Sequence, residues 1–288
     1  MLSSTNQIQF VQSTEQRQHL PLLEQEKESK MYYKMLVIAF AVIATVFMCG
    51  NIAKAQVVTK GLVSYWTFDK ADVDGDTVED VFGKHNGTMK GDPKVVEGKV
   101  GQALEFDGDD YVDFGDTESL NIDPPLTVSM YINNKDASAS FIWQGGEKSG
   151  STKNYIYVRG DGGMNVGQWP PGGGDLNSPK GLLETRGEWY YITAVFDDKY
   201  LLYVDGSLEG ELKAEVYSGP TPTAWLLGTR LFPANAAYYF IGLVDELGVY
   251  DRALSEDEIN QNMNAGGWAA VQPVNKLALT WGDLKASR

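Results

Sequence analysis

The chain has 288 residues, of which 43% are hydrophobic and 11% aromatic, so it can bury a full core and is not disordered as a whole. Its formal net charge of −15 argues against nucleic acid and anionic membranes as partners, because binding to either requires clustered lysine and arginine. Such an acidic chain is compatible with bound Ca²⁺ and neutral glycans, or the charge simply keeps the protein soluble.

The first predicted element is an apolar run from Met35 to Gly50, which Lys34 precedes and the small-residue sequence Ala53-Lys54-Ala55 follows. This pattern is typical of a secretory signal peptide that is cleaved before Gln56. The run is shorter than the roughly 20 apolar residues that span a bilayer, which favours a signal over a membrane anchor.

Residues 1–30 are polar and are unusual in front of a signal peptide. Either translation starts at Met31 or Met35, or these residues form a cytoplasmic tail and the apolar run is a membrane anchor. We therefore expect a secreted or cell-surface protein, with a single-pass anchored protein as the alternative. In that second case the membrane is contacted through the N-terminal segment alone.

Three parts of the chain follow from this pattern: residues 1–55 as extension plus signal peptide or anchor, residues 56–265 as one globular domain, and residues 266–288 as a C-terminal tail. The single cysteine, Cys49, lies in the first part. The exported domain must therefore fold without disulfides.

From Gly61 onward, short runs of Val, Ile, Tyr, Phe and Trp alternate with clusters of Gly, Asp, Asn and Pro, which is typical of an all-β sandwich or barrel. The first run, residues 61–69, is apolar at both odd and even positions, so we expect a strand covered on both faces. No long amphipathic helical pattern interrupts the runs, which makes a parallel βαβ architecture improbable.

The clearest strand pair is Trp189 to Phe196 and Tyr200 to Val204, with a turn at Asp197-Asp198 between them and a second turn at Asp205-Gly206. Asp-Gly between apolar runs predicts a tight hairpin, because glycine accepts the positive φ that such turns require.

Near the C-terminus, residues 241–250 predict the last strand, which carries the adjacent acids Asp245 and Glu246. Adjacent strand residues point to opposite faces, so we expect one acid to point inward and the other into solvent. The two cannot then form the close carboxyl pair of a glycosidase. One short helix follows, in which Ser255 and Glu258 have the spacing of a capping box.

Catalytic patterns are scarce in the exported part. It contains one histidine, His85, and no cysteine, so a Ser-His-Asp site would depend on His85. No glycine-rich phosphate loop precedes a helix. We therefore expect no catalytic residue and no enzyme activity.

Four aromatic residues lie in or beside the central loops: Trp143, Tyr155, Tyr157 and Trp169. Their flat rings could stack on sugars, which makes them the candidate ligand-binding residues. The alternative is that they fill the space between sheets, as aromatic residues at strand spacing commonly do.

Taken in order, several motifs make residues 61–264 resemble the LamG-like jelly-roll domain of the concanavalin A-like lectin/glucanase superfamily. They are GLVSYWTFD, HNGTMKG, GKVGQALEFDGDDYVDF, LTVSMYI, EWYYITAVFDDKYLLYVDG and IGLVDELGVYDRALSEDEI. One departure is Tyr131, where this family usually has tryptophan. The resemblance implies two antiparallel sheets packed face to face as a jelly-roll β-sandwich.

The resemblance also implies a structural calcium ion between the first strand, a glycine loop and the final strand. Asp69, Asp107 with Gly108, and Asp245 occupy those places in this sequence. Alternatively, Asp245 accepts backbone hydrogen bonds and stabilises a strand crossing.

The expected function is a secreted or surface-exposed, non-catalytic binding or adhesion module for a glycan or an extracellular protein, with Ca²⁺ as a possible structural cofactor. The alternatives are a glycoside hydrolase of the same superfamily and a membrane-tethered interaction domain.

Overall fold

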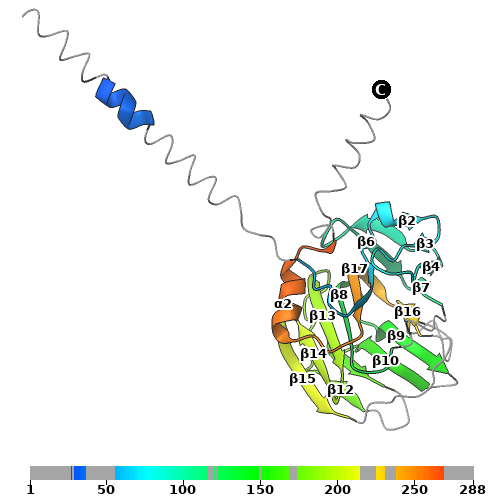
Figure 1. Cartoon of the computed structure of the whole chain (residues 1–288). Coiled ribbons are helices and arrows are strands. Elements are labelled where there is room, and N and C mark those ends of the chain that lie inside the picture. The colour runs from blue at the N-terminus through cyan, green and yellow to red at the C-terminus, as the bar shows by residue number, and fades with distance from the viewer. Residues whose placement is uncertain are drawn as a thin grey trace, which may run out of the picture. The chain divides into compact units, whose positions relative to one another are not determined.

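The computed structural model describes residues 27, 29–36, 56–115, 120, 122–148, 151–168, 174–214, 225–230 and 238–268 (Figure 1). The chain divides into two compact units, Met1–Ala53 and Lys54–Arg288. In the first unit, residues 29–36 are helical and exposed. None of the helices within the described ranges is long and apolar enough to cross a membrane. Of the expected signal segment, positions 37 to 55 lie outside the described residues.

The second unit is a sandwich of two antiparallel sheets, as predicted. Within the described residues, sheet A has the strand order β15-β14-β13-β8-β17-β6-β5, and β1 also pairs with β17. Its strands are β1 (Leu62–Trp66), β5 (Lys94–Glu97), β6 (Gln102–Asp107), β8 (Leu126–Asn134), β13 (Trp189–Phe196), β14 (Lys199–Val204), β15 (Ser207–Lys213) and β17 (Ile241–Tyr250).

Sheet B has the order β12-β11-β10-β9-β16-β7-β4-β3-β2 within the same residues. Its strands are β2 (Val73–Asp74), β3 (Thr77–Val78), β4 (Gly87–Lys90), β7 (Tyr111–Asp113), β9 (Ser140–Lys148), β10 (Ser151–Val158), β11 (Met164–Gly167), β12 (Asp175–Asn177) and β16 (Trp225–Leu227). A 3₁₀ turn, η1 (Lys70–Asp72), precedes β2, and the predicted C-terminal helix is α2 (Glu256–Asn264).

The main core lies between the two sheets. On β13, Ile192, Ala194 and Phe196 point into it, and the residues between them point to the other face of sheet A. This two-residue alternation is what a pleated strand dictates. Trp66 and Trp143 are the largest side chains that are fully buried.

The outer face of sheet A is covered as well. A second apolar cluster joins Tyr131, Tyr191 and Val195 on the sheet to Ile259 of α2 and to Val58, just before β1. Sheet A is therefore buried on both faces, and the expectation that β1 is covered on both sides is confirmed by Trp66 in one cluster and Tyr65 in the other.

The predicted hairpins are confirmed. β13 pairs with β14, and β14 pairs with β15 through the turn at Asp205 and Gly206, whose φ angles are 49° and 78°. Two consecutive positive φ values are those of a type I′ turn, the geometry that matches the twist of adjacent strands.

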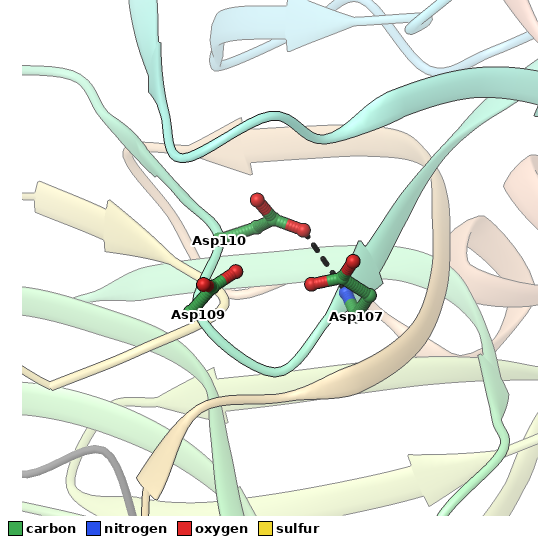
Figure 2. A group of neighbouring side chains, drawn as sticks. All are labelled: Asp107, Asp109 and Asp110. Atoms are coloured by element: carbon green, nitrogen blue, oxygen red, sulfur yellow. Dashed lines mark hydrogen bonds between the residues drawn. The ribbon is translucent and has the colours of Figure 1, made fainter.

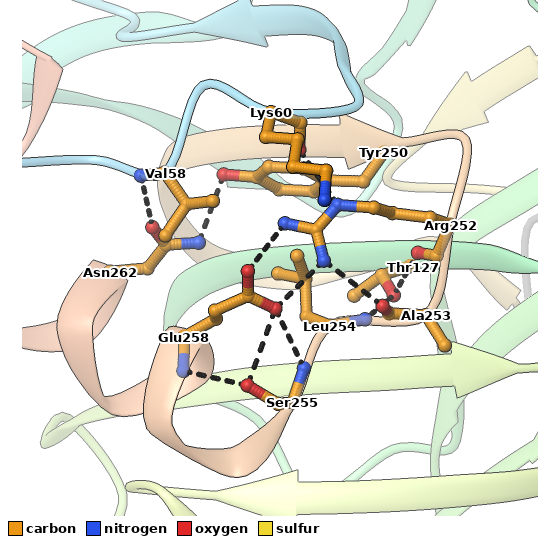
Figure 3. A network of polar contacts seen from close by, with 10 residues as sticks. All are labelled: Val58, Lys60, Thr127, Tyr250, Arg252, Ala253, Leu254, Ser255, Glu258 and Asn262. Atoms are coloured by element: carbon orange, nitrogen blue, oxygen red, sulfur yellow. Dashed lines mark hydrogen bonds and ion pairs between the residues drawn. The ribbon is translucent and has the colours of Figure 1, made fainter.

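A polar network fixes α2 to the sandwich (Figure 3). The guanidinium of Arg252 donates two hydrogen bonds to the carboxylate of Glu258, at 2.7 and 2.8 Å. These bonds lower the pKa of Glu258 to about 2. Ser255 Oγ accepts a hydrogen bond from the Glu258 amide, and Glu258 accepts one from the Ser255 amide, so the predicted capping box is confirmed.

The same network holds the two ends of the domain together. The side-chain amide of Asn262 in α2 accepts a hydrogen bond from the Val58 amide at 2.7 Å and donates one to the Tyr250 hydroxyl at 2.9 Å. One side chain therefore links the segment before β1, the last strand and the final helix.

We expect Ser255→Ala to lower the free energy of unfolding by about 1 kcal/mol, because it leaves a first-turn amide of α2 without its acceptor. Urea denaturation measures the change. Ser207→Ala, at an exposed site at the start of β15, is the matched control and should change stability by less than about 0.5 kcal/mol. Equal stabilities of the Ser255 variant and the parent protein would contradict the capping role.

Candidate functional site

An open recess lies on the outer face of sheet B, with a volume of about 200 Å³. We call it the aromatic recess. It is lined by Phe141, Tyr155, Tyr157, Asn165, Asp175, Arg230 and Tyr238.

Strand alternation places these side chains on the outer face. On β10, Ile156 and Val158 belong to the core, so Tyr155 and Tyr157 point away from it. Likewise, β11 directs Met164 and Val166 inward and Asn165 outward, and β12 directs Leu176 inward and Asp175 outward. Neighbouring strands therefore contribute outward residues at one level of the sheet.

The aromatic rings of the recess meet around Phe141. Its ring centroid lies 5.6 Å from that of Tyr155, 4.8 Å from that of Tyr157 and 5.8 Å from that of Tyr238. The interplanar angles are 60° to 76°, so the rings are tilted against one another. They form angled apolar walls around a buried Phe141, and Tyr157 and Tyr238 remain partly exposed.

Polar groups complete the recess. The Tyr155 hydroxyl donates a hydrogen bond to Asp175. The pKa of Tyr155 is raised mainly by burial and, to a smaller extent, by this bond. Arg230 is 6% exposed, and its guanidinium carbon lies 5.5 Å from the centre of the Phe141 ring, a cation–π distance. Asn165 Oδ1 is buried and has no hydrogen-bond partner among the residues that the structure describes.

The four predicted ligand-binding residues have different outcomes. The structure brings Tyr155 and Tyr157 together in the recess. Trp143 is a correction, since it is fully buried between the sheets, contacts Trp225 and donates a hydrogen bond to Asn154. Trp169 lies outside the described residues.

A β-bulge explains why Trp143 was misplaced. Tyr157 pairs with Phe141 and Ile156 pairs with Trp143, so β9 carries one extra residue, Ile142, between them. Residues two positions apart normally share a face, and the bulge reverses that relation. It turns Phe141 outward and Trp143 inward, which no local sequence pattern reveals. Arg230 and Tyr238, from the segments after β16 and before β17, also carry no signal in the sequence.

The acid pair of β17 is a second correction. Asp245 is 0% and Glu246 2% exposed, so neither acid points into solvent. The pairing of β17 with β8 shifts between Asp245 and Gly248, and Glu246 has a φ of 53°. This irregularity breaks the alternation that the prediction assumed.

Backbone amides hold one oxygen of each acid. Asp245 Oδ2 accepts a hydrogen bond from the Val100 amide at 2.8 Å, and Glu246 Oε2 accepts one from the Trp268 amide at 2.9 Å. Gly98 permits the first contact, because a Cβ at that position would lie 2.7 Å from Asp245 Oδ2. The alternative role predicted for Asp245, that it accepts backbone hydrogen bonds, agrees with this geometry.

Burial raises the pKa of Asp245 to about 8 and that of Glu246 to about 7. Neighbouring charges contribute to these raised pKa values: Glu246 and then Asp69 act on Asp245, and Asp69 and then Asp72 act on Glu246. Asp245 Oδ1 and Glu246 Oε1 have no hydrogen-bond partner within the described part of the chain. The backbone amides thus compensate one oxygen of each acid, and the nearby Tyr65 hydroxyl opposes the rise in the pKa of Glu246. Burial of the remaining oxygens in ionised form is costly without a further donor or cation.

The four predicted calcium ligands do not come together. Asp69 accepts a hydrogen bond from the Gln102 amide at 2.7 Å, at the start of β6 and close to Asp245. Asp107 is the last residue of β6, where it pairs with Ile241. It therefore lies five residues, or about 16 Å, from Gln102 along the strand. Gly108 follows Asp107 directly. The predicted ligands therefore form two separate groups, Asp69 with Asp245 and Asp107 with Gly108. The glycine loop near Asp245 is Gly98 to Gly101 instead.

Asp107 belongs to another acidic cluster, with Asp109 and Asp110 (Figure 2). One carboxylate oxygen from each lies within 4.8 Å of the others. Asp110 is buried and accepts hydrogen bonds from the amides of Asp92 and Asp107, whereas Asp107 and Asp109 are exposed. These bonds stabilise the turn between β6 and β7.

Ser64 and Asp80, the neighbours of His85 that the structure describes, do not form a catalytic triad with it. Ser64 Oγ lies 2.6 Å and Asp80 Oδ2 3.4 Å from the same ring nitrogen, Nδ1. A triad places serine and aspartate on opposite ring nitrogens, with the serine accessible, whereas Ser64 is fully buried. Asp80 also accepts hydrogen bonds from the amides of Tyr65, Phe82, Gly83 and His85, as expected of a turn-stabilising residue.

Comparison with protein families matches residues 106–260 to the concanavalin A-like lectin/glucanases superfamily. No curated protein matches the chain.

Among solved structures, domain 4 of AbnA, a GH43 extracellular arabinanase from Geobacillus stearothermophilus in complex with arabinotriose, is similar with a TM-score of 0.52 and 18% identity; the match covers 70% of this chain and 98% of that one. A Trypanosoma rangeli sialidase in complex with sialic acid has a TM-score of 0.58 and 16% identity, and the match covers 73% of this chain and 34% of the sialidase. The binding domain of Paraclostridial Mosquitocidal Protein 1 has a TM-score of 0.53 and 16% identity, and the match covers 71% of this chain and 52% of that one. At these identities the likeness shows the fold alone, and this chain spans about a third of the sialidase.

The raised pKa values of the acid pair predict a pH-dependent stability. A folded state that holds protons more tightly than the unfolded state is most stable at low pH and loses that stability as pH rises. In the presence of chelator, we expect the free energy of unfolding to fall between about pH 5 and pH 8, by on the order of 3 kcal/mol. Asp245→Asn should flatten this dependence, and Asp74→Asn, at an exposed acid, should not. A parent protein whose urea denaturation midpoint rises over this range would contradict the assignment.

Proposed function

Because the chain belongs to the concanavalin A-like lectin/glucanases superfamily, we propose that it is a non-catalytic binding module for glycans that acts outside the cytoplasm. The observation that carries this proposal is the aromatic recess. Aromatic walls with a few convergent polar groups are the usual composition of a small-molecule site, and aromatic faces suit the apolar faces of sugar rings. Domain 4 of the arabinanase, which shares the fold, is described in complex with arabinotriose.

The described residues favour binding over hydrolysis. Retaining glycosidases place two carboxyl groups about 5 to 5.5 Å apart, on either side of the scissile bond. Among the described residues that line the recess, Asp175 is the one carboxylate. The acids Asp245 and Glu246 are buried, so a polysaccharide cannot reach them.

We also retain the expected export of the domain as a proposal. The apolar run after Lys34 and the Ala53-Lys54-Ala55 sequence support cleavage before Gln56. N-terminal sequencing of the protein made by its own cells separates the two possibilities. Gln56 as the first residue supports secretion, and retention of residues 35–50 in a membrane fraction supports anchoring.

A structural Ca²⁺ fits Asp69 and Asp245 better than it fits the full set of predicted ligands. Asp245 Oδ1 is a buried oxygen without a hydrogen-bond partner among the described residues, and Asp69 adds negative charge nearby. Hard oxygen ligands of this kind suit Ca²⁺, which also accepts backbone carbonyls and water. Asp69 and Asp245 would hold the ion, which would supply the positive charge that the buried carboxylates lack.

A glycan array probed with the full exported domain tests the function. We expect binding to at least one glycan class, and a loss of at least tenfold in affinity with Tyr157→Ala, because this ring is a partly exposed wall of the recess. Phe82→Ala removes an aromatic ring that is 42% exposed and does not line the recess, and it should bind as the parent does. Incubation with the bound polysaccharides should release no sugar; hydrolysis would support the glycoside hydrolase alternative.

Thermal melting tests the ion. We expect Ca²⁺ to raise the melting temperature relative to chelator, since a ligand of the folded state stabilises it. Asp245→Asn should abolish this rise, and Asp107→Asn should retain it. The reverse result would place the ion at the turn between β6 and β7.

A further inference from the structure

The polar groups of the aromatic recess distinguish between classes of glycan, and this inference rests on the proposed function. We propose that the recess selects a neutral sugar, with hydroxyl groups bound between Arg230 and Asp175, and discriminates against sugars that carry a carboxylate.

Charge is the first argument. The residues that line the recess include one guanidinium, Arg230, and one carboxylate, Asp175. Asp175 raises and Arg230 lowers the pKa of Tyr155, so both charges lie close to the Tyr155 hydroxyl. The charges of the described lining residues therefore balance, whereas the whole chain has a net charge of −15. An anionic sugar would gain no net attraction from this balanced pair and would meet a repulsive field outside the recess.

Hydrogen-bonding capacity is the second argument. The guanidinium of Arg230 can only donate, and an ionised Asp175 can only accept. Asn165 adds an oxygen that is buried and has no donor among the described residues. A sugar hydroxyl both donates and accepts, so a diol can satisfy acceptor and donor together. A carboxylate on the ligand only accepts, so it would leave the Asn165 oxygen without a donor and would add no donor to Asp175 beyond the Tyr155 hydroxyl.

Pre-organisation is the third argument. Arg230 is almost fully buried and its guanidinium lies over the Phe141 ring, so little side-chain freedom remains to be lost when a ligand binds. Asp175 is held by the Tyr155 hydroxyl. The donor and the acceptor are therefore oriented before a sugar arrives, between the partly exposed rings of Tyr157 and Tyr238.

The test compares matched sugars on the full exported domain. Isothermal titration measures the affinity for the methyl glycoside of a neutral hexose and for the methyl glycoside of the uronic acid with the same ring configuration. We use glucose with glucuronic acid and galactose with galacturonic acid as the two pairs. We expect at least one neutral glycoside to bind, and its uronic acid counterpart to bind at least tenfold more weakly.

Asp175→Asn removes the negative charge and keeps an oxygen that can accept from Tyr155. We expect this variant to reduce the discrimination to less than threefold. Asp161→Asn, at an exposed acid that does not line the recess, should leave it unchanged. Thermal melts of both variants verify that each is folded.

Two failures are distinguishable. A uronic acid that binds as tightly as its neutral partner, or more tightly, overturns the inference and leaves glycan binding in place. The absence of binding to either member of both pairs and to every glycan of the array overturns the proposed function itself, and the inference with it.

Discussion

The alternation of side chains along a pleated strand is the constraint on which this molecule depends. Sheet A is apolar on both faces, because the core covers one and α2 with the segment before β1 covers the other. Sheet B has the core on one face, and among the described residues its outer face is open at the aromatic recess. The aromatic recess lies there for that reason, on the outward positions of four neighbouring strands.

Two local exceptions to the alternation determine which side chains lie in the recess and which acids are buried. The bulge at Ile142 moves Phe141 to the outer face and Trp143 to the core. The irregularity at Glu246 buries two carboxylates side by side. A bulge costs a ladder hydrogen bond and is retained where it redirects a side chain. In this protein, one bulge supplies the centre of the recess, and the other irregularity buries two carboxyl groups whose pKa values are raised.

The sequence predicted the architecture well and the sites poorly, for the same physical reason. Period-two runs, the Asp205-Gly206 turn and the Ser255-Glu258 capping box are local patterns, and local patterns determine strands, hairpins and the helix start. The recess instead depends on the bulge between β9 and β10, and on Arg230 and Tyr238, which come from segments that lie later in the chain. Tyr155 and Tyr157 were predicted as flat rings in or beside the central loops, and they reach the recess because they alternate with core residues on one strand. Trp143 and the acid pair were misplaced because one inserted residue changes the face of a side chain.

The hydrogen bonds of Asn262 bring the beginning and the end of the domain to one place. A folding unit whose two ends meet can be inserted into a loop of a host protein without separating the flanking chain. The same closeness allows the original ends to be joined by a short linker and new ones to be opened at an exposed turn, such as Asp197-Asp198. Tolerance of insertion into longer chains is thus a property that follows from the closeness of the two ends.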